Sequence, residues 1–80
     1  MRLPRDVSGA ELVKLLARLG YSVTRQTGSH MRLTLAEAPE HHITVPNHSS
    51  LRVGTLAAIL QAVATRLTMS REDLVVLLFG

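Results

Sequence analysis

The sequence contains no cysteine and no tryptophan, and only one tyrosine and one phenylalanine. Without cysteine, neither a disulfide framework nor a thiolate zinc site can stabilise the fold. With two aromatic residues, the chain has no set of stacking platforms of the kind that holds single-stranded bases. No apolar run approaches the roughly 20 residues that span a bilayer, and the first residues lack the apolar core of a signal peptide. We therefore expect a soluble, cytoplasmic protein with no membrane partner.

The chain is short and basic. Its 80 residues predict one domain over residues 1–80. The core must be thin, because a chain of this length buries only about 60–65% of the surface that it exposes when unfolded. Eight of the nine basic residues are arginines, whose planar guanidinium groups suit two-pronged phosphate contacts. The net charge of +3 permits nucleic-acid binding without requiring it, because the same charge also keeps a small domain soluble.

Helix signals stand on either side of the middle of the chain. Ser8 and Glu11 form a capping box, after which leucines recur at helical spacing, and Gly20 is placed to end this first helix. A second helix is predicted to open at Gly54-Thr55, with apolar residues along one side. Ser70 resembles the N-cap of a short final helix. The sequence therefore predicts two longer helices and a short C-terminal one.

Between the first two helices the hydrophobic period changes to two, which is typical of strands. Three strands are predicted, over residues 21–27, 30–35 and 41–45. Gly28 marks the first turn, because glycine accepts a positive φ without a Cβ penalty, and residues 36–40 form a five-residue hairpin loop. Pro46 closes the third strand because it has no amide to donate. Residues 2–4 are a candidate for a small additional edge strand.

The five-residue loop predicts the pairing of the last two strands. It places Leu33 opposite Ile43, and His30 opposite Pro46. Because side chains alternate between the two faces of a strand, His30 and Arg32 then lie on the face away from the helices. The outline is a helix, three antiparallel strands, a helix and a short extra helix. This order predicts an α+β two-layer sandwich.

Three blocks of residues carry a resemblance to a known family. They are Arg25-Gln26-x-Gly28-Ser29-His30, Ile43-Thr44-Val45-Pro46-x-His48 and Gly54-Thr55-Leu56-x-x-Ile59-Leu60. In order and spacing they resemble the HicA/YcfA-like toxins of type II toxin–antitoxin systems, over nearly the whole chain. The resemblance implies a double-stranded-RNA-binding-like α-β-β-β-α fold. Relatives usually have a short glycine-containing turn before the last helix. Residues 61–69 are longer here and lack glycine, so either the second helix extends or the tail packs differently.

The resemblance also implies a function. The family cleaves messenger RNA without a metal or other cofactor, and the essential histidine of its Gly-Ser-His motif corresponds to His30. Its partner is a HicB-type antitoxin, which covers the active site and can repress transcription of the pair. We therefore expect an mRNA interferase, an endoribonuclease toxin whose partners are mRNA and a HicB-type antitoxin.

The residue types are compatible with that activity. RNA carries its own nucleophile, the 2′-hydroxyl, so the enzyme needs only to position it, move a proton and stabilise charge. Histidine exchanges protons near neutral pH, so His30 suits either the acid or the base role. Gly28 would let the backbone approach a phosphate closely, and Ser29 would donate to it. Arg25 and Arg32 are the nearest candidate phosphate ligands. Arg25 is an even number of residues from the apolar positions of its strand, so alternation places its side chain on their face. We therefore expect it to reach solvent at the strand end.

The other histidines leave alternatives open. His48 either lines the same site and contacts RNA, or ties down its loop by hydrogen bonding. His41 and His42 are adjacent in a strand and point to opposite faces, and no carboxylate stands at ligand spacing, so we expect no metal site. The alternative function is a non-catalytic RNA-binding or protein-interaction module on the same fold. His30 discriminates the two, because a pure binder needs a cation there rather than a proton shuttle.

Overall fold

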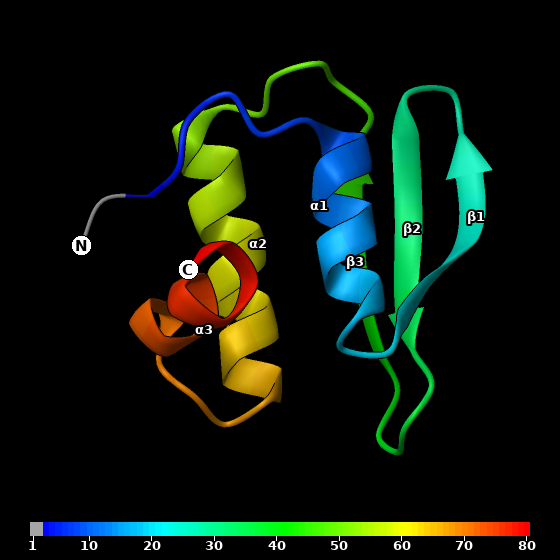
Figure 1. Cartoon of the computed structure of the whole chain (residues 1–80). Coiled ribbons are helices and arrows are strands. Elements are labelled where there is room, and N and C mark those ends of the chain that lie inside the picture. The colour runs from blue at the N-terminus through cyan, green and yellow to red at the C-terminus, as the bar shows by residue number, and fades with distance from the viewer. Residues whose placement is uncertain (1–2) are drawn as a thin grey trace.

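The structure is a computed structural model, which describes residues 3–80. Its elements follow the order α1 (Gly9–Ala17), β1 (Tyr21–Thr27), β2 (His30–Leu35), β3 (His41–Pro46), α2 (Val53–Arg66) and α3 (Arg71–Phe79). The helices cover one face of the sheet, with α1 against β1 and β3, α2 against β3, and α3 packed on α2 (Figure 1). The predicted α+β architecture, with its α-β-β-β-α core and extra C-terminal helix, is confirmed.

The helix α1 begins as its capping box predicts. The Ser8 side chain accepts a hydrogen bond from the Glu11 amide at 3.0 Å, and the Glu11 carboxylate accepts one from the Ser8 amide at 3.4 Å. The helix ends at Ala17, before the predicted end at Gly20. Gly20 instead takes a φ of 102° in the turn that leads into β1, a left-handed conformation that favours glycine.

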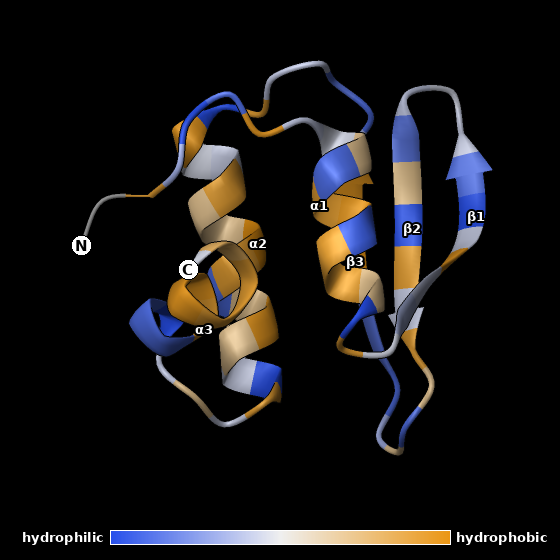
Figure 2. Cartoon of the chain, viewed as in Figure 1, coloured by the Kyte–Doolittle hydropathy of each residue, from blue (hydrophilic) through white to orange (hydrophobic). Residues whose placement is uncertain are grey.

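The three strands form one antiparallel sheet in the order β1-β2-β3. The pairing of β2 with β3 is as predicted, with Leu33 opposite Ile43 and His30 opposite Pro46. Hydrophilic and hydrophobic residues alternate along β2, so one face of the sheet is apolar and the other polar (Figure 2). The pairing of β1 with β2 is interrupted by a register shift between Val23 and Arg25.

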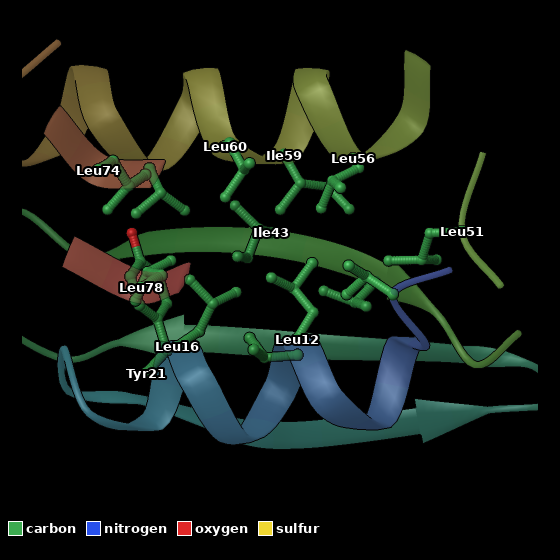
Figure 3. Close-up of a cluster of buried hydrophobic side chains, with 14 of the residues drawn as sticks. Leu12, Leu16, Tyr21, Ile43, Leu51, Leu56, Ile59, Leu60, Leu74 and Leu78 are labelled. Carbon is green, nitrogen blue, oxygen red and sulfur yellow. The ribbon is translucent and has the colours of Figure 1, made fainter. Parts of the chain in front are cut away.

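The core lies between the helices and the apolar face of the sheet. Side chains of α2 point toward Ile43 of β3, and those of α1 point into the same layer (Figure 3). The side chains in this layer that expose less than 2% of their surface are mainly leucines, among them Leu12, Leu16, Leu33, Leu56, Leu60 and Leu74. Among the described residues no helix packs against the polar face of the sheet, and His30 and Arg32 on that face are exposed.

The segment without glycine is accommodated by extension of α2. The helix begins at Val53, one residue before the predicted start, and runs to Arg66. It ends with Thr68 at a φ of 57°, where a glycine is usual. The Thr68 amide donates to the Thr65 carbonyl at 3.2 Å, and the Met69 amide donates to the Ala64 carbonyl at 3.0 Å. Threonine thus occupies the glycine position of a Schellman motif.

The ends of the chain differ from expectation at one point. Ser70 caps α3 as predicted, accepting from the Asp73 amide at 3.0 Å. Leu3 and Pro4 belong to no strand, and Arg2 lies outside the described residues, so the predicted edge strand is wrong for the described part.

Among the described residues, no single helix is long and apolar enough to cross a membrane. The helices α2 and α3 together reach that length, but the chain bends by 105° between them.

Candidate functional site

The Gly28-Ser29 turn joins β1 to β2 in two residues, since Thr27 pairs directly with His30. Gly28 has a φ of 57°, and glycine in the first position of a two-residue hairpin is typical of a type II′ turn. A Cβ placed on Gly28 would meet nothing within 4 Å. The glycine is therefore required by the backbone conformation, and the space around it is open to a ligand.

His30 is the first residue of β2 and lies on the polar face of the sheet. Its neighbours across the sheet are Thr27 on β1 and Pro46 on β3. The side chain is exposed. The predicted orientation of His30 away from the core is confirmed. An exposed imidazole at a turn is free to contact a bound substrate without disturbing the packing of the protein.

Backbone hydrogen bonds tie this turn to the loop after β3. The Asn47 amide donates to the Ser29 carbonyl at 2.6 Å, and the Gly9 amide at the start of α1 donates to the His48 carbonyl at 2.9 Å. The backbone of His48 therefore fastens its loop to α1, while its side chain is exposed. Ser29 is exposed, so its hydroxyl is accessible to an incoming phosphate.

Arg25 reaches the polar face by a route that strand parity does not predict. A β-bulge at Thr24 shifts the register, so that Val23 pairs with Leu33 but Arg25 pairs with Arg32. Directly opposed residues of an antiparallel pair share a face, so Arg25 lies on the same face as Arg32. The expectation that Arg25 needs the strand end to reach solvent is wrong, because the bulge turns it outward.

Among residues 3–80, no carboxylate forms an ion pair with Arg25 or Arg32. In the described part of the chain the one ion pair is between His42 and Glu40, at 3.1 Å, and it includes neither arginine. Glu40 and Glu37 lie in the loop at the other end of β2 from the Gly28-Ser29 turn. Like charges directly opposed across a sheet are destabilising. Two uncompensated cations beside His30 therefore form a surface suited to an anion.

A chain of hydrogen bonds crosses the polar face next to the arginines. The Thr24 hydroxyl contacts the Thr34 hydroxyl at 2.8 Å, and Thr34 contacts His42 Nδ1 at 2.8 Å. His42 Nε2 reaches Glu40, and the Thr24 hydroxyl also donates to the Arg32 carbonyl at 3.4 Å. Thr34 is buried by these neighbours although it faces away from the helices. This series of hydrogen bonds links all three strands and holds the bulged residue Thr24 in place.

A second polar cluster lies on the apolar side, at the other end of the sheet. The Tyr21 hydroxyl contacts His41 Nδ1 at 2.6 Å. Burial lowers the pKa of His41, and the nearby charge of Arg66 lowers it further. Burial raises the pKa of Tyr21, against the opposing effect of Arg66. Arg66 donates to the carbonyls of Glu37 and Pro39, so it holds the 36–40 loop. This cluster was not predicted, and it stabilises the end of the sheet remote from His30.

The four histidines do not converge. His41 and His42 point to opposite faces as predicted, and His30 and His48 lie at the other end of the sheet. Across residues 3–80, no three side chains of the histidine, cysteine, aspartate or glutamate type come close enough to hold a metal ion. The site that the structure assembles consists of a histidine, a serine hydroxyl, a glycine turn and two arginines.

Comparison with known protein families gives a match over most of the chain. A family model described as HicA toxin of bacterial toxin–antitoxin matches residues 9–64, which include α1, all three strands and most of α2. Searches of curated proteins and of solved structures find no match. The matched segment contains the Gly28-Ser29 turn, His30 and both arginines.

Proposed function

Because this chain belongs to the HicA toxin family of bacterial toxin–antitoxin systems, we propose that it is a metal-independent endoribonuclease that cleaves mRNA. The observation that carries the proposal is the placement of His30. The imidazole is exposed at the open turn Gly28-Ser29, on the same face as two arginines that pair with no carboxylate in the described part of the chain. A proton-transfer group beside uncompensated cations is what cleavage of a phosphodiester requires.

The reaction follows from the substrate's own chemistry. The 2′-oxygen of a ribose attacks the adjacent phosphorus, and the bond from phosphorus to the 5′-oxygen of the next nucleotide breaks. One product ends in a 2′,3′-cyclic phosphate and the other in a 5′-hydroxyl. The attacking hydroxyl loses a proton and the departing oxygen gains one. His30 carries out one of these two transfers and solvent water carries out the other. General acid–base help of this kind contributes roughly 10²–10⁴-fold to the rate.

The remaining groups position the phosphate and neutralise it. The Ser29 hydroxyl is free to donate to a phosphate oxygen, and Gly28 leaves room for the phosphate to approach the backbone. Arg25 and Arg32 supply positive charge that attracts the RNA backbone to this face of the sheet. With one histidine and exposed arginines, the enzyme is expected to be slow. The side chain of His48 is exposed one residue beyond Asn47, whose amide holds the turn, and it is a further candidate for RNA contact.

Incubation of the purified protein with labelled RNA in EDTA tests the proposal. Wild-type protein should produce fragments, and His30→Ala should lose them while keeping its fold, since an exposed substitution changes stability by about 0.5 kcal/mol or less. Ser22→Ala is the matched control, because Ser22 lies on β1 opposite Thr34, toward the far end of the sheet. Fragments that persist in His30→Ala would contradict the catalytic assignment. RNA that is shifted but intact with wild-type protein would instead support a non-catalytic binding module.

Membership of the family implies a toxin–antitoxin partner, and we propose that this partner is a HicB-type antitoxin that covers the face carrying His30. Stoichiometric antitoxin should stop cleavage and protect the backbone amides of residues 28–30 from hydrogen exchange. Binding that leaves both cleavage and those amides unchanged would contradict this placement of the partner.

A further inference from the structure

We propose that Arg25 and Arg32 form a subsite for the phosphodiester next to the one that is cleaved at His30. The inference rests on the proposed function and names the smallest good substrate, an RNA segment with two consecutive phosphates. The turn with Ser29 and His30 would hold the scissile phosphate. The arginine pair would hold its neighbour.

The spacing of residues along the sheet supports the assignment of one phosphate to His30 and of the next phosphate to the arginine pair. Arg32 follows His30 by two residues on the same face of β2, which separates their Cα atoms by roughly 6.5–7 Å. This is close to the separation of consecutive phosphates along an extended nucleic-acid strand. Arg25 faces Arg32 from the adjacent strand, with Cα atoms about 4.5–5.5 Å apart. One phosphate between the two guanidinium groups would therefore be adjacent to a phosphate at His30.

The charges of Arg25 and Arg32 also favour a bound phosphate between them. An opposed pair of arginines costs folding free energy unless an anion lies between them. Within the described residues no carboxylate pairs with either guanidinium group. Arginine forms two-pronged hydrogen bonds with phosphate, and two arginines from neighbouring strands approach one phosphate from two sides. A bound phosphodiester would remove the repulsion that the free protein carries.

The protein holds this pair in place with structure of its own. Without the bulge, alternation would turn Arg25 toward the helices. The bulged residue Thr24 is bonded to Thr34 at 2.8 Å, and Thr34 is in turn bonded to His42. Bulges commonly re-aim a side chain at a functional site. Thr34 is therefore a positioning residue, which acts on the phosphate through the placement of Arg25.

Three short substrates test the subsite. The first is a ribodinucleoside monophosphate, which has one cleavable phosphate. The other two are trinucleoside diphosphates with a single 2′-hydroxyl, placed so that the additional phosphate lies on the 5′ or the 3′ side of the cleavable bond. For wild-type protein, one of the two trimers should exceed the dimer in kcat/KM by about tenfold, the order expected for a charge-assisted contact at an exposed site.

Arginine variants identify the origin of that gain. In Arg25→Gln and in Arg32→Gln the advantage of the trimer over the dimer should fall below about twofold, because kcat/KM should fall more for the trimer than for the dimer. Arg18→Gln is the charge-matched control, because Arg18 is the C-cap of α1, at the opposite end of that helix from Gly9. It should keep the advantage. A trimer that gains nothing in wild-type protein, or a gain that survives both substitutions, would overturn the subsite.

Thr34 gives an independent test of the positioning role. Thr34→Val keeps the shape of the side chain and removes the hydroxyl that holds Thr24, so the trimer's advantage should fall while the dimer is still cleaved. Thr34→Ser restores the hydroxyl and should restore the advantage. A merely structural defect would lower the cleavage of dimer and trimer alike. Equal loss for both substrates would therefore refute the positioning role.

A binding measurement separates this inference from the proposed function. The fully 2′-deoxy dimer and trimer cannot be cleaved by attack of a 2′-hydroxyl. Titrated into isotope-labelled protein and followed by NMR, the trimer should bind about tenfold more tightly than the dimer, with shifts at residues 25 and 32. Arg25→Gln should abolish the difference. If RNA is not cleaved but this preference is found, the proposed catalysis fails and the subsite stands. If RNA is cleaved but the preference is absent, the subsite is overturned and the proposed catalysis stands.

Discussion

Substitution of Gly9 by alanine should destabilise the protein, although helix propensity alone predicts the opposite. Gly9 is the first residue of α1, where alanine in place of glycine at an unobstructed position would add about 0.4–1 kcal/mol. Here a Cβ would collide with the Pro46 carbonyl oxygen and lie 3.1 Å from the Asn47 Cα. Both obstacles are backbone, so no side-chain rotation relieves them. Overpacking of this kind costs about 1–3 kcal/mol, so we expect a net loss of about 1–2 kcal/mol.

Thermal unfolding followed by circular dichroism measures this loss. For a domain of this size, 1 kcal/mol corresponds to a Tm shift of roughly 4–8 °C. Gly54→Ala is the matched control, because Gly54 also lies in the first turn of a helix but a Cβ there would meet nothing within 4 Å. It should raise stability by about 0.4–1 kcal/mol. A Tm for Gly9→Ala at or above that of wild type would refute the reasoning, as would losses of equal size at both positions.

Three further predictions concern the end of the molecule remote from His30. Thr68→Gly should stabilise the protein by about 1 kcal/mol, because a left-handed conformation is costly for threonine, and an unchanged or lower Tm would count against this. Burial lowers the pKa of His41, so the unfolded state takes up more protons and stability should fall as the pH drops below 6.5. Urea unfolding at two pH values measures this, and an equally steep loss in His41→Gln would exclude His41 as its source. Arg66→Met removes the donors to the Glu37 and Pro39 carbonyls, so the 36–40 loop should exchange its amides faster, at a cost of about 1 kcal/mol. Unchanged exchange in that loop would contradict the role of Arg66.

Alternation and loop length were sufficient to predict the β2–β3 hairpin. A five-residue loop and the condition that apolar residues share one face leave a single register, and it places His30 opposite Pro46 on the polar face. The Gly28 turn was predictable for a similar reason, because only glycine takes a positive φ without a steric penalty. These two features determine where His30 lies.

The placement of Arg25 was not predictable from the same pattern. The alternation of side chains between the two faces holds only along an uninterrupted strand, and the bulge at Thr24 interrupts β1. Nothing in the local composition signals a bulge, because Thr24 is an ordinary strand residue. The bulge is held by a threonine on the next strand and a histidine on the third, contacts that exist only after the sheet has formed. The resemblance identified Arg25 as part of a motif, but its position opposite Arg32 required the structure.

Other missed features are also tertiary. The segment without glycine gave no stop signal for α2, because Thr68 adopts the conformation in which glycine is expected. Gly9 lies between the two capping-box residues of α1, and nothing in that local sequence indicates how closely the Pro46 backbone approaches it. The contact between Tyr21 and His41 joins the first strand to the third and has no local signature. Thr68 is an unusual residue for its conformation, and Gly9 and Tyr21 are constrained by residues that are distant in the sequence.

Identification of the product ends is the most direct test of the central claim, cleavage through the 2′-hydroxyl with His30 as the proton-transfer group. An RNA oligonucleotide is incubated with wild-type protein or with His30→Ala in EDTA, and the fragments are analysed by mass spectrometry. The account predicts fragments that end in a 2′,3′-cyclic phosphate, paired with fragments that begin with a 5′-hydroxyl, from wild-type protein alone. Fragments with 3′-hydroxyl and 5′-phosphate ends, or the same fragments from His30→Ala, would contradict it.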